Sequence, residues 1–412
     1  MKRTALACCL SLLLLGLGAA TASADTDHQS YDVIEHGRYL AALADCAGCH
    51  NEPGGKPYAG GLALATPFGK ILAPNITPDR DTGIGAWSDD DFVNALLNGT
   101  GPGGERLYPA MPYPYYTKMS RKEALAIRAY LDTIEPVNHD VVPNQLPFPF
   151  NIRASLRVWD SLFFTPGRFE PVAGQSAKWN RGAFLVQGPG HCGVCHTKKN
   201  FFGGDESSHA LQGGALQGWF APNLTGDPRL GLGGWSVEDI ATYLKTGHNR
   251  ITAATGPMSE VVVDSTSQLH DDDLHAIAVY LKSLPEREEA PKPVADNDPA
   301  MRAGSAIFAD QCSACHMPTG DGIPNMFPAL KGSAAVQSAD PTNLIRIVLQ
   351  GARSVATDAA PTAPGMPAFD WKLSDAEAAA VVTYVRNGWG NAAAAVSSGD
   401  VRRQRDALGE EP

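Results

Sequence analysis

Residues 42–53 read ALADCAGCHNEP and contain two cysteines, Cys46 and Cys49, followed at once by His50. Two cysteines three positions apart with a histidine directly behind the second can hold zinc, carry out thiol exchange or attach a haem covalently. This stretch alone does not separate the three chemistries, so the rest of the chain must decide between them.

The same five-residue pattern occurs three times. The copies are Cys46-Ala-Gly-Cys49-His50, Cys192-Gly-Val-Cys195-His196 and Cys312-Ser-Ala-Cys315-His316. A disulfide framework would not place a histidine behind every pair, and a zinc site would need further ligands at finger-like spacing. A thioredoxin-like motif is not expected three times in one chain. The repeated pattern therefore predicts three covalently bound haem c groups.

Haem attachment explains the spacing. Two thiols on one helical turn can face the same way and add to the two vinyl groups of one haem, while the adjacent imidazole binds the iron. The predicted attachment residues are Cys46, Cys49, Cys192, Cys195, Cys312 and Cys315, and the predicted proximal iron ligands are His50, His196 and His316.

The first 24 residues have the features of a secretory signal peptide. Lys2 and Arg3 precede an apolar run, and small residues at 22–24 predict cleavage before Asp25. Removal of this segment would change the formal net charge from −11 to −13. We expect a periplasmic protein, and the acidic charge argues against nucleic acid as a partner.

Alignment on the three motifs divides the chain into repeated units of about a hundred residues, a normal size for a domain. The predicted segments are a signal peptide (1–24), domain 1 (34–136), an apolar connector (137–175), domain 2 (176–285), a charged linker (286–298), domain 3 (299–390) and a polar tail (391–412). Each domain is expected to be all-α, with its haem supplying part of the core.

Helix signals recur after each motif. Ser88 with Asp91, and Ser236 with Asp239, predict helices that end at Gly99 and Gly247, whereas in the third unit Asp340 caps a helix with Pro341 first and Gly351 at its end. The closing helices begin at the capping boxes Ser120/Glu123 and Ser374/Glu377, and more weakly at His270 in the second unit.

Each unit must also supply a sixth ligand to its iron. A methionine follows each helix-ending glycine in a proline-containing loop, and these three are Met111, Met258 and Met366. A His/Met pair raises the haem potential. The remaining methionines past the signal, expected to be core fillers or surface residues, are Met119, Met301, Met317 and Met326. The histidines His139 and His248 have no counterpart in the other repeats.

Two further features are relevant to the sites. Proximal imidazoles usually donate their second ring proton to a carbonyl group, and the proline-bearing stretches at Pro74, Pro222 and Pro328 are candidates to accept it. The connector carries an apolar stripe, which either straps the first two domains together or offers a surface to a partner subunit or a membrane. The stripe consists of Ile152, Leu156, Trp159 and Phe163.

Together with the tripled motif, the segments TPFGKILAPNITPD, WSDDDF, LYPAMPY and LPFPFNIR resemble the triheme cytochrome c subunits of membrane-associated periplasmic dehydrogenases. These are the subunits of quinohaemoprotein alcohol dehydrogenases and of flavin-dependent gluconate, sorbitol and fructose dehydrogenases. The resemblance covers about residues 34–390. It implies three tandem class I cytochrome c domains. The polar tail departs from the relatives that end in an amphipathic membrane-binding segment.

The resemblance also implies partners. A dehydrogenase catalytic subunit with flavin, PQQ or molybdenum would supply the electrons, and ubiquinone or another respiratory acceptor would receive them at the outer face of the inner membrane. The sequence shows no Rossmann glycine fingerprint and no repeat-matched acid/base pair, so we expect no catalytic residue and no substrate-oxidising site in this chain. Two alternatives stay open: a free periplasmic shuttle to a terminal oxidase, and a haem enzyme with an open iron position.

Overall fold

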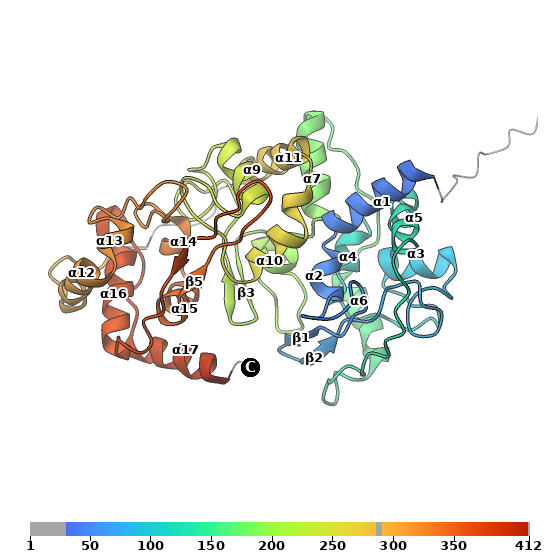
Figure 1. The fold of residues 1–412 in the computed structure, drawn as a ribbon, viewed down its shortest axis with the longest axis horizontal. Coiled ribbons are helices and arrows are strands. Elements are labelled where there is room, and N and C mark those ends of the chain that lie inside the picture. The colour runs from blue at the N-terminus through green and yellow to red at the C-terminus, as the bar shows by residue number, and fades with distance from the viewer. Residues whose placement is uncertain (1–29, 286–290, 411–412) are drawn as a thin grey trace, which may run out of the picture.

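The computed structural model describes residues 30–285 and 291–410 (Figure 1). The predicted signal peptide, its cleavage site and the first part of the 286–298 linker lie outside these residues. The described chain is mainly helical, as predicted, with the addition of three two-stranded antiparallel sheets that the sequence analysis did not anticipate. In Figure 1 the chain runs from the blue N-terminal helices through the green and yellow middle to the red C-terminal helices at the opposite end.

The first two units share one order of elements, whereas in the third the short sheet follows the helix after the motif instead of preceding it. The first unit contains α1 (Tyr31–Leu43), α2 (Cys46–His50), β1 (Ala63–Thr66), β2 (Gly69–Leu72), α3 (Asp89–Asn98), α4 (Tyr113–Tyr116) and α5 (Arg121–Leu131). The second contains α7 (Ala177–Gln187), α8 (Gly193–His196), β3 (Gly214–Leu216), β4 (Trp219–Ala221), α9 (Val237–Thr246), α10 (Pro257–Asp264) and α11 (Asp271–Lys282). The third contains α12 (Pro299–Gln311), α13 (Ser313–His316), α14 (Ala334–Gln337), α15 (Thr342–Gln350), β5 (Ala352–Arg353), β6 (Gly365–Met366), α16 (Asp375–Asn387) and α17 (Ser398–Glu410).

Five shorter elements complete the chain. The connector forms the 3₁₀ turn η1 (Arg153–Ser155) and the helix α6 (Leu156–Phe163), and the other 3₁₀ turns are η2 (Ser207–His209), η3 (Thr266–Gln268) and η4 (Gly388–Gly390).

In each unit the first long helix (α1, α7 or α12) crosses the closing helix (α5, α11 or α16) at a glycine. A Cβ atom built on Gly37, Gly182 or Gly304 would lie only 1.8, 1.9 or 2.1 Å from a backbone carbonyl oxygen of the facing helix. The facing carbonyls belong to Ala126, Ala276 and Ala380. The two helix backbones therefore approach more closely than any side chain would allow, and the same contact recurs in all three units.

The predicted caps are largely confirmed. The boxes Ser88/Asp91, Ser236/Asp239, Ser120/Glu123 and Ser374/Glu377 all form, and α3 and α9 end at Gly99 and Gly247. The weaker cap predicted at His270 does not form, because its side chain makes no capping hydrogen bond. In the third unit the helix begins one residue later than predicted: Pro341 precedes the first helical residue, and the carboxylate of Asp340 accepts a hydrogen bond from the N–H of Thr342 (2.8 Å).

A carboxylate of the second unit joins it to the first. Asp273, at the start of α11, accepts hydrogen bonds from Nε (2.8 Å) and Nη2 (2.7 Å) of Arg181 and from the hydroxyl of Tyr39 on α1 (2.5 Å). The Tyr39 ring also stacks on His270, with 4.3 Å between the ring centroids. Burial opposes the ionisation of Asp273, but these hydrogen bonds outweigh it and hold its pKa below the usual value.

We expect Asp273→Asn to lower the free energy of unfolding by about 2 kcal/mol at pH 7, the scale of hydrogen bonds to a charged group. The pKa of Asp273 is depressed in the folded state, so this contribution is complete well above about pH 4 and is lost as the pH falls through the folded pKa. Denaturant unfolding at pH 7 and near pH 3 measures it, and the difference between the two proteins should shrink at the lower pH. Asp272→Asn, at an exposed neighbour, is the matched control and should change little.

The second and third units are joined by an amide bridge. The side chain of Asn343 on α15 accepts a hydrogen bond from the N–H of Phe220 (2.8 Å) and donates one to its carbonyl (2.7 Å), as if it were an added strand of the β3–β4 hairpin. The guanidinium of Arg346 lies over the ring of Trp219, 4.6 Å from its centroid. The N–H of Ala329 also donates to the carbonyl of Ile251 (3.0 Å).

The connector contacts both of the units that it joins. Asp160 on α6 accepts a hydrogen bond from the hydroxyl of Tyr113 (2.6 Å) and pairs with Arg106, both in the first unit. The indole of Trp159 donates to the carbonyl of Phe202 in the second unit (2.9 Å), and the Phe163 ring lies where a side chain on Gly204 would otherwise project. These contacts confirm the strap interpretation.

The tail is partly packed. Residues 391–396 cover the closing helix of the third unit, where the N–H of Val396 donates to the hydroxyl of Thr383 (2.9 Å) and the N–H of Ala393 donates to the side-chain oxygen of Asn387 (3.2 Å). Helix α17 then packs against α16 with Val401 fully buried. Among the described residues no helix combines the length and the apolar character needed to cross a membrane.

Candidate haem sites

Each cysteine pair lies on or beside a single short helix that ends in its histidine. Helix α2 includes both Cys46 and Cys49, whereas α8 and α13 begin directly after the first cysteine of their pairs, Cys192 and Cys312. None of these six cysteines forms a disulfide bond within the described residues. One helical turn holds both sulfurs and the following imidazole. Each segment can therefore bond to two edge positions of a planar ring through its sulfurs, while its imidazole binds a metal at the centre of that ring.

The three motif histidines make equivalent hydrogen bonds through their Nδ1 atoms. The Nδ1 atoms of His50, His196 and His316 lie 2.7, 2.7 and 3.0 Å from the carbonyl oxygens of Pro74, Pro222 and Pro328. A carbonyl can only accept, so Nδ1 carries the proton and donates, and Nε2 keeps its lone pair for a metal. Burial lowers the pKa of all three imidazoles, which favours this neutral form. The predicted carbonyl partners are confirmed.

A glycine that sequence reasoning missed completes each site. The backbone N–H groups of Gly60, Gly213 and Gly322 donate to the carbonyl oxygens of His50, His196 and His316, at 2.8, 2.9 and 3.1 Å. All three glycines have positive φ, at 74°, 102° and 62°. A Cβ atom on Gly60 or Gly322 would also come within 2.6 Å of the proline carbonyl oxygen that accepts the imidazole proton. Glycine is therefore required for both its conformation and its size.

Buried polar side chains fix the direction of the proline carbonyl in the first unit. Asn75 is 3% exposed, its side-chain oxygen accepts from the N–H of Thr77 (2.9 Å), and its amide donates to the carbonyl of Val137 (2.7 Å). In the second unit Asn223 makes the same contact to Thr225 (2.7 Å). These turns are part of the site, since they hold the peptide that orients the histidine.

The thiols are poorly suited to the two alternative chemistries. The pKa of Cys46 and Cys49 is raised to about 12 and that of Cys195 and Cys312 to about 11, mainly because these thiols are buried. Thiol exchange needs the thiolate, which these surroundings disfavour, and zinc would need further ligands, whereas the described residues contain no group of three or more His, Cys, Asp or Glu side chains that could hold a metal ion. A thioether to a haem is a neutral group, so the residues present fit covalent haem better than either alternative.

The methionines separate by exposure into three groups. The three predicted iron ligands, Met111, Met258 and Met366, are all half-buried. Met119 and Met301 are buried in the core, whereas Met317 and Met326 are exposed, so their expected filler or surface placement is confirmed. The residues in this half-buried group lie in the loop before α4, in the first turn of α10 and in β6. Met366 borders a hollow of about 630 Å³ that is also lined by Gln350 and Gly351.

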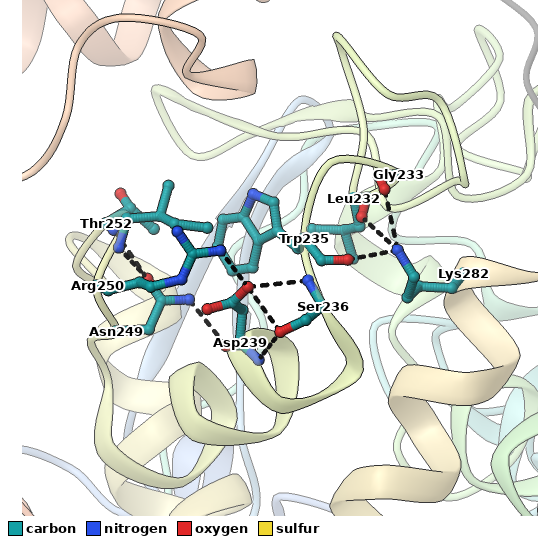
Figure 2. Close-up of polar contacts among 10 residues, drawn as sticks. Leu232, Gly233, Trp235, Ser236, Asp239, Asn249, Arg250, Thr252 and Lys282 are labelled. Carbon is teal, nitrogen blue, oxygen red and sulfur yellow. Dashed lines mark hydrogen bonds and ion pairs between the residues drawn. The ribbon is translucent and has the colours of Figure 1, made fainter. Parts of the chain in front are cut away.

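The loop that leads to Met258 is anchored on the N-terminus of α9, as Figure 2 shows. The carboxylate of Asp239 accepts hydrogen bonds from the N–H of Ser236 (2.9 Å) and from Arg250 (2.8 Å), while the side chain of Asn249 donates to its backbone carbonyl (2.8 Å). Burial of Asp239 is outweighed by these hydrogen bonds, and its pKa is lowered. Lys282 holds the preceding turn through the carbonyl of Gly233 (3.0 Å). The helix cap therefore also fixes the methionine loop.

With this geometry established, comparison with known proteins is informative. The Cytochrome c family matches residues 34–135 and 301–389, which contain the first and third motifs. The chain is 40% identical to the gluconate 2-dehydrogenase cytochrome c subunit of Pantoea cypripedii, over 96% of this chain and 95% of that protein. This chain belongs to the family of dehydrogenase cytochrome c subunits.

Other members of the family are similar over most of their length. The chain is 38% identical to the cytochrome c subunit of the quinone alcohol dehydrogenase of Gluconobacter oxydans, over 97% of this chain and 87% of that protein. It is 35% identical to the fructose dehydrogenase cytochrome subunit of Gluconobacter japonicus, over 90% and 82%. As a cytochrome c, the chain binds haem covalently, and its function is electron transfer.

Proposed function

We propose that this chain is the triheme electron-transfer subunit of a periplasmic dehydrogenase complex, folded as three tandem class I cytochrome c domains at 34–136, 176–285 and 299–390. One observation carries the proposal. In each of the three motifs the histidine Nδ1 faces an equivalent proline carbonyl, and an equivalent glycine N–H donates to the histidine's own carbonyl oxygen. The middle unit, which the Cytochrome c family does not match, shares both contacts. This equivalence supports a haem in every unit.

In this proposal the six cysteines of the three motifs would form the thioethers, and a histidine and a methionine of each unit would bind its iron. The pairs are His50 with Met111, His196 with Met258, and His316 with Met366. Each bound haem would carry one electron by changing between ferric and ferrous iron. The chain holds each imidazole neutral and oriented through its carbonyl partner. In the second unit the loop that leads to Met258 is also tied to the helix before it, which restricts where the methionine can lie.

The partner in this proposal is a dehydrogenase catalytic subunit with flavin, PQQ or molybdenum. The relatives named above are cytochrome subunits of gluconate, quinone alcohol and fructose dehydrogenases, which supports a partner of this class. We infer a periplasmic location at the outer face of the inner membrane, with ubiquinone or another respiratory acceptor receiving the electrons. The outward face of the connector supports a docking role, because Val158 and Leu162 on α6 and the nearby Phe202 are each more than 60% exposed.

Isolation of the native chain under mild conditions tests this proposal. Mass spectrometry should find three covalently bound haems on a chain that begins at Asp25, and a large dehydrogenase subunit should co-purify with it. Addition of that subunit's substrate should then reduce all three haems. A count of two haems would contradict the triheme assignment. A chain that carries three haems but purifies alone would favour a free shuttle, and a high-spin haem would favour an enzyme with an open iron position.

A further inference from the structure

The segment that carries Met111 continues directly into a contact with the second motif. Helix α4 follows Met111 after one residue, and its Tyr115 lies against Gly193, which stands between the two cysteines of the second motif. A Cβ atom on Gly193 would be 2.5 Å from the Tyr115 hydroxyl oxygen and 3.0 Å from a ring carbon. Gly193 belongs to helix α8, where the backbone conformation does not require glycine. The absence of a side chain at this position instead makes room for the ring of Tyr115. The Tyr115 hydroxyl is held by Asp205, which pairs with Lys199.

The next residue on α4 links the two motifs. The hydroxyl of Tyr116 donates to the carbonyl of Ala44 (2.5 Å), two residues before Cys46. Its ring packs edge-to-face on His191, one residue before Cys192, with 5.5 Å between the centroids. Tyr116 is 3% exposed, so both contacts are made in the interior. One side chain of the first unit thus contacts the segments that lead into both attachment sites.

The methionine segment of the second unit makes the reciprocal contact with the first motif. Helix α10 carries Met258 in its first turn and packs against α2, the helix of the first motif. Just beyond α10, the hydroxyl of Ser265 donates to the carbonyl of Leu43 (3.4 Å). Two carboxylates of α10, on Glu260 and Asp264, face Asp45 at the start of α2, and after burial they are the charges that raise its pKa to about 8.

The third unit is arranged differently. Met366 itself lies in β6, which pairs with β5 of its own unit in the register Ala352 to Met366, and the N–H of Ser354 donates to the carbonyl of Pro364 (3.0 Å). The segment before Met366 contacts the second unit at the end of α9, where the hydroxyl of Thr357 donates to the carbonyl of Thr246 (3.5 Å). Its motif is also more open, since Cys315 is exposed whereas the cysteines of the first two motifs are half-buried. The exchange of methionine segments therefore distinguishes the first two units from the third.

We propose that the first and second haem sites form one redox-coupled pair, in which the methionine segment of each site packs against the attachment segment of the other. This inference rests on the proposed ligation by Met111 and Met258. Buried contacts screen charge poorly, so a charge gained at one site is felt at the other. Reduction of the first site should therefore make the second harder to reduce, and Tyr115 and Tyr116 act as positioning residues for this coupling.

A ligand exchange at the first site tests the coupling. Met111→His should give a bis-histidine haem of lower potential, which stays oxidised while the second site titrates. Met258→His is the converse variant. Potentiometric titration followed by optical and electron paramagnetic resonance spectra should show that, of the first two sites, the one reduced later in the native chain moves to a more positive potential when the other is held oxidised. Met366→His is the matched control, and its effect on these two sites should be smaller. The proposal is overturned if neither site moves when the other is held oxidised, or if the displaced site moves as far in Met366→His.

A second pair of variants tests the contact itself. Gly193→Ala places a methyl group against Tyr115, and should reduce the displacement that one of the first two sites shows when the other is held oxidised. Ser313→Ala, at the same position of the third motif, should leave that displacement unchanged. If Gly193→Ala also left it unchanged, the positioning role of α4 would be wrong. The number of bound haems and the methionine–iron absorption band are recorded for every variant and for the unsubstituted protein. If the unsubstituted protein lacked a haem or a methionine–iron bond, the proposed function would be contradicted instead.

Discussion

Replacement of Met111, Met258 or Met366 singly by alanine is expected to remove about one third of the weak absorption band near the red edge that reports methionine–iron bonds. The same variant should lower the midpoint potential of one haem, because a thioether ligand stabilises ferrous iron relative to the weaker ligand that replaces it. Each change removes one bond from a half-buried side chain in an anchored loop, so the other two haems should keep their spectra. Optical spectra of the ferric protein and potentiometric titration measure both effects.

The remaining methionines provide the controls for this experiment. Met326 is 52% exposed, and Met326→Ala should leave the band and all three potentials unchanged. Met119 is fully buried, so Met119→Ala should lower stability by about 2 to 5 kcal/mol while the band persists in the folded protein. If Met326→Ala removed part of the band and Met366→Ala did not, the ligand assigned in the third unit would be wrong.

The largest loss of stability is expected at the helix crossings. Gly182→Ala puts a methyl group 1.9 Å from the carbonyl oxygen of Ala276, well inside contact distance, so α7 and α11 must move apart along their whole interface. Overpacking costs about 1 to 3 kcal/mol when side chains can yield, and here the obstacle is backbone, so we expect at least about 3 kcal/mol. Denaturant unfolding of the haem-loaded protein measures the change.

Gly409→Ala is the matched control for this substitution. Gly409 also lies in a helix, α17, but nothing stands within 4 Å of the position of its Cβ atom. There the added methyl group should stabilise the protein by about 0.5 to 1 kcal/mol through the better helix propensity of alanine. Equal effects of the two substitutions would show that helix propensity, rather than the close approach of α7 to α11, determines the result at Gly182.

Much of the local structure was predictable because its signals are local. The capping boxes of α3, α5, α9 and α16 each depend on two residues three positions apart, and the helix-ending glycines follow at normal helix lengths. The carbonyl partners of the motif histidines were also predictable. They lie in proline-bearing stretches that recur after each motif, and the chemistry of a ligating imidazole demands such an acceptor.

Other parts of the sites could not be found from spacing. The glycines that donate to the histidine carbonyls lie 10, 17 and 6 residues beyond His50, His196 and His316, because loops of different length separate them. The helix-crossing glycines lie 9, 10 and 8 residues before the first cysteines of their motifs, but only the packed helices reveal their shared contact. The contacts between units depend on single pairs far apart in the chain, such as Asn343 with Phe220, for which one sequence gives no signal.

The contacts between units also have a consequence for electron transfer between the three proposed haems. The Asp273 cluster joins the first unit to the second, and Asn343 joins the second to the third, so donor and acceptor sites keep fixed separations. Redox domains on flexible tethers must first diffuse into contact, and solvent viscosity then limits their rate. In the triheme assignment proposed above, no such search would precede transfer within the chain. The internal rate would instead be governed by distance, driving force and reorganisation energy, and added glycerol should slow the encounter with outside partners while leaving transfer between the proposed haems unaffected.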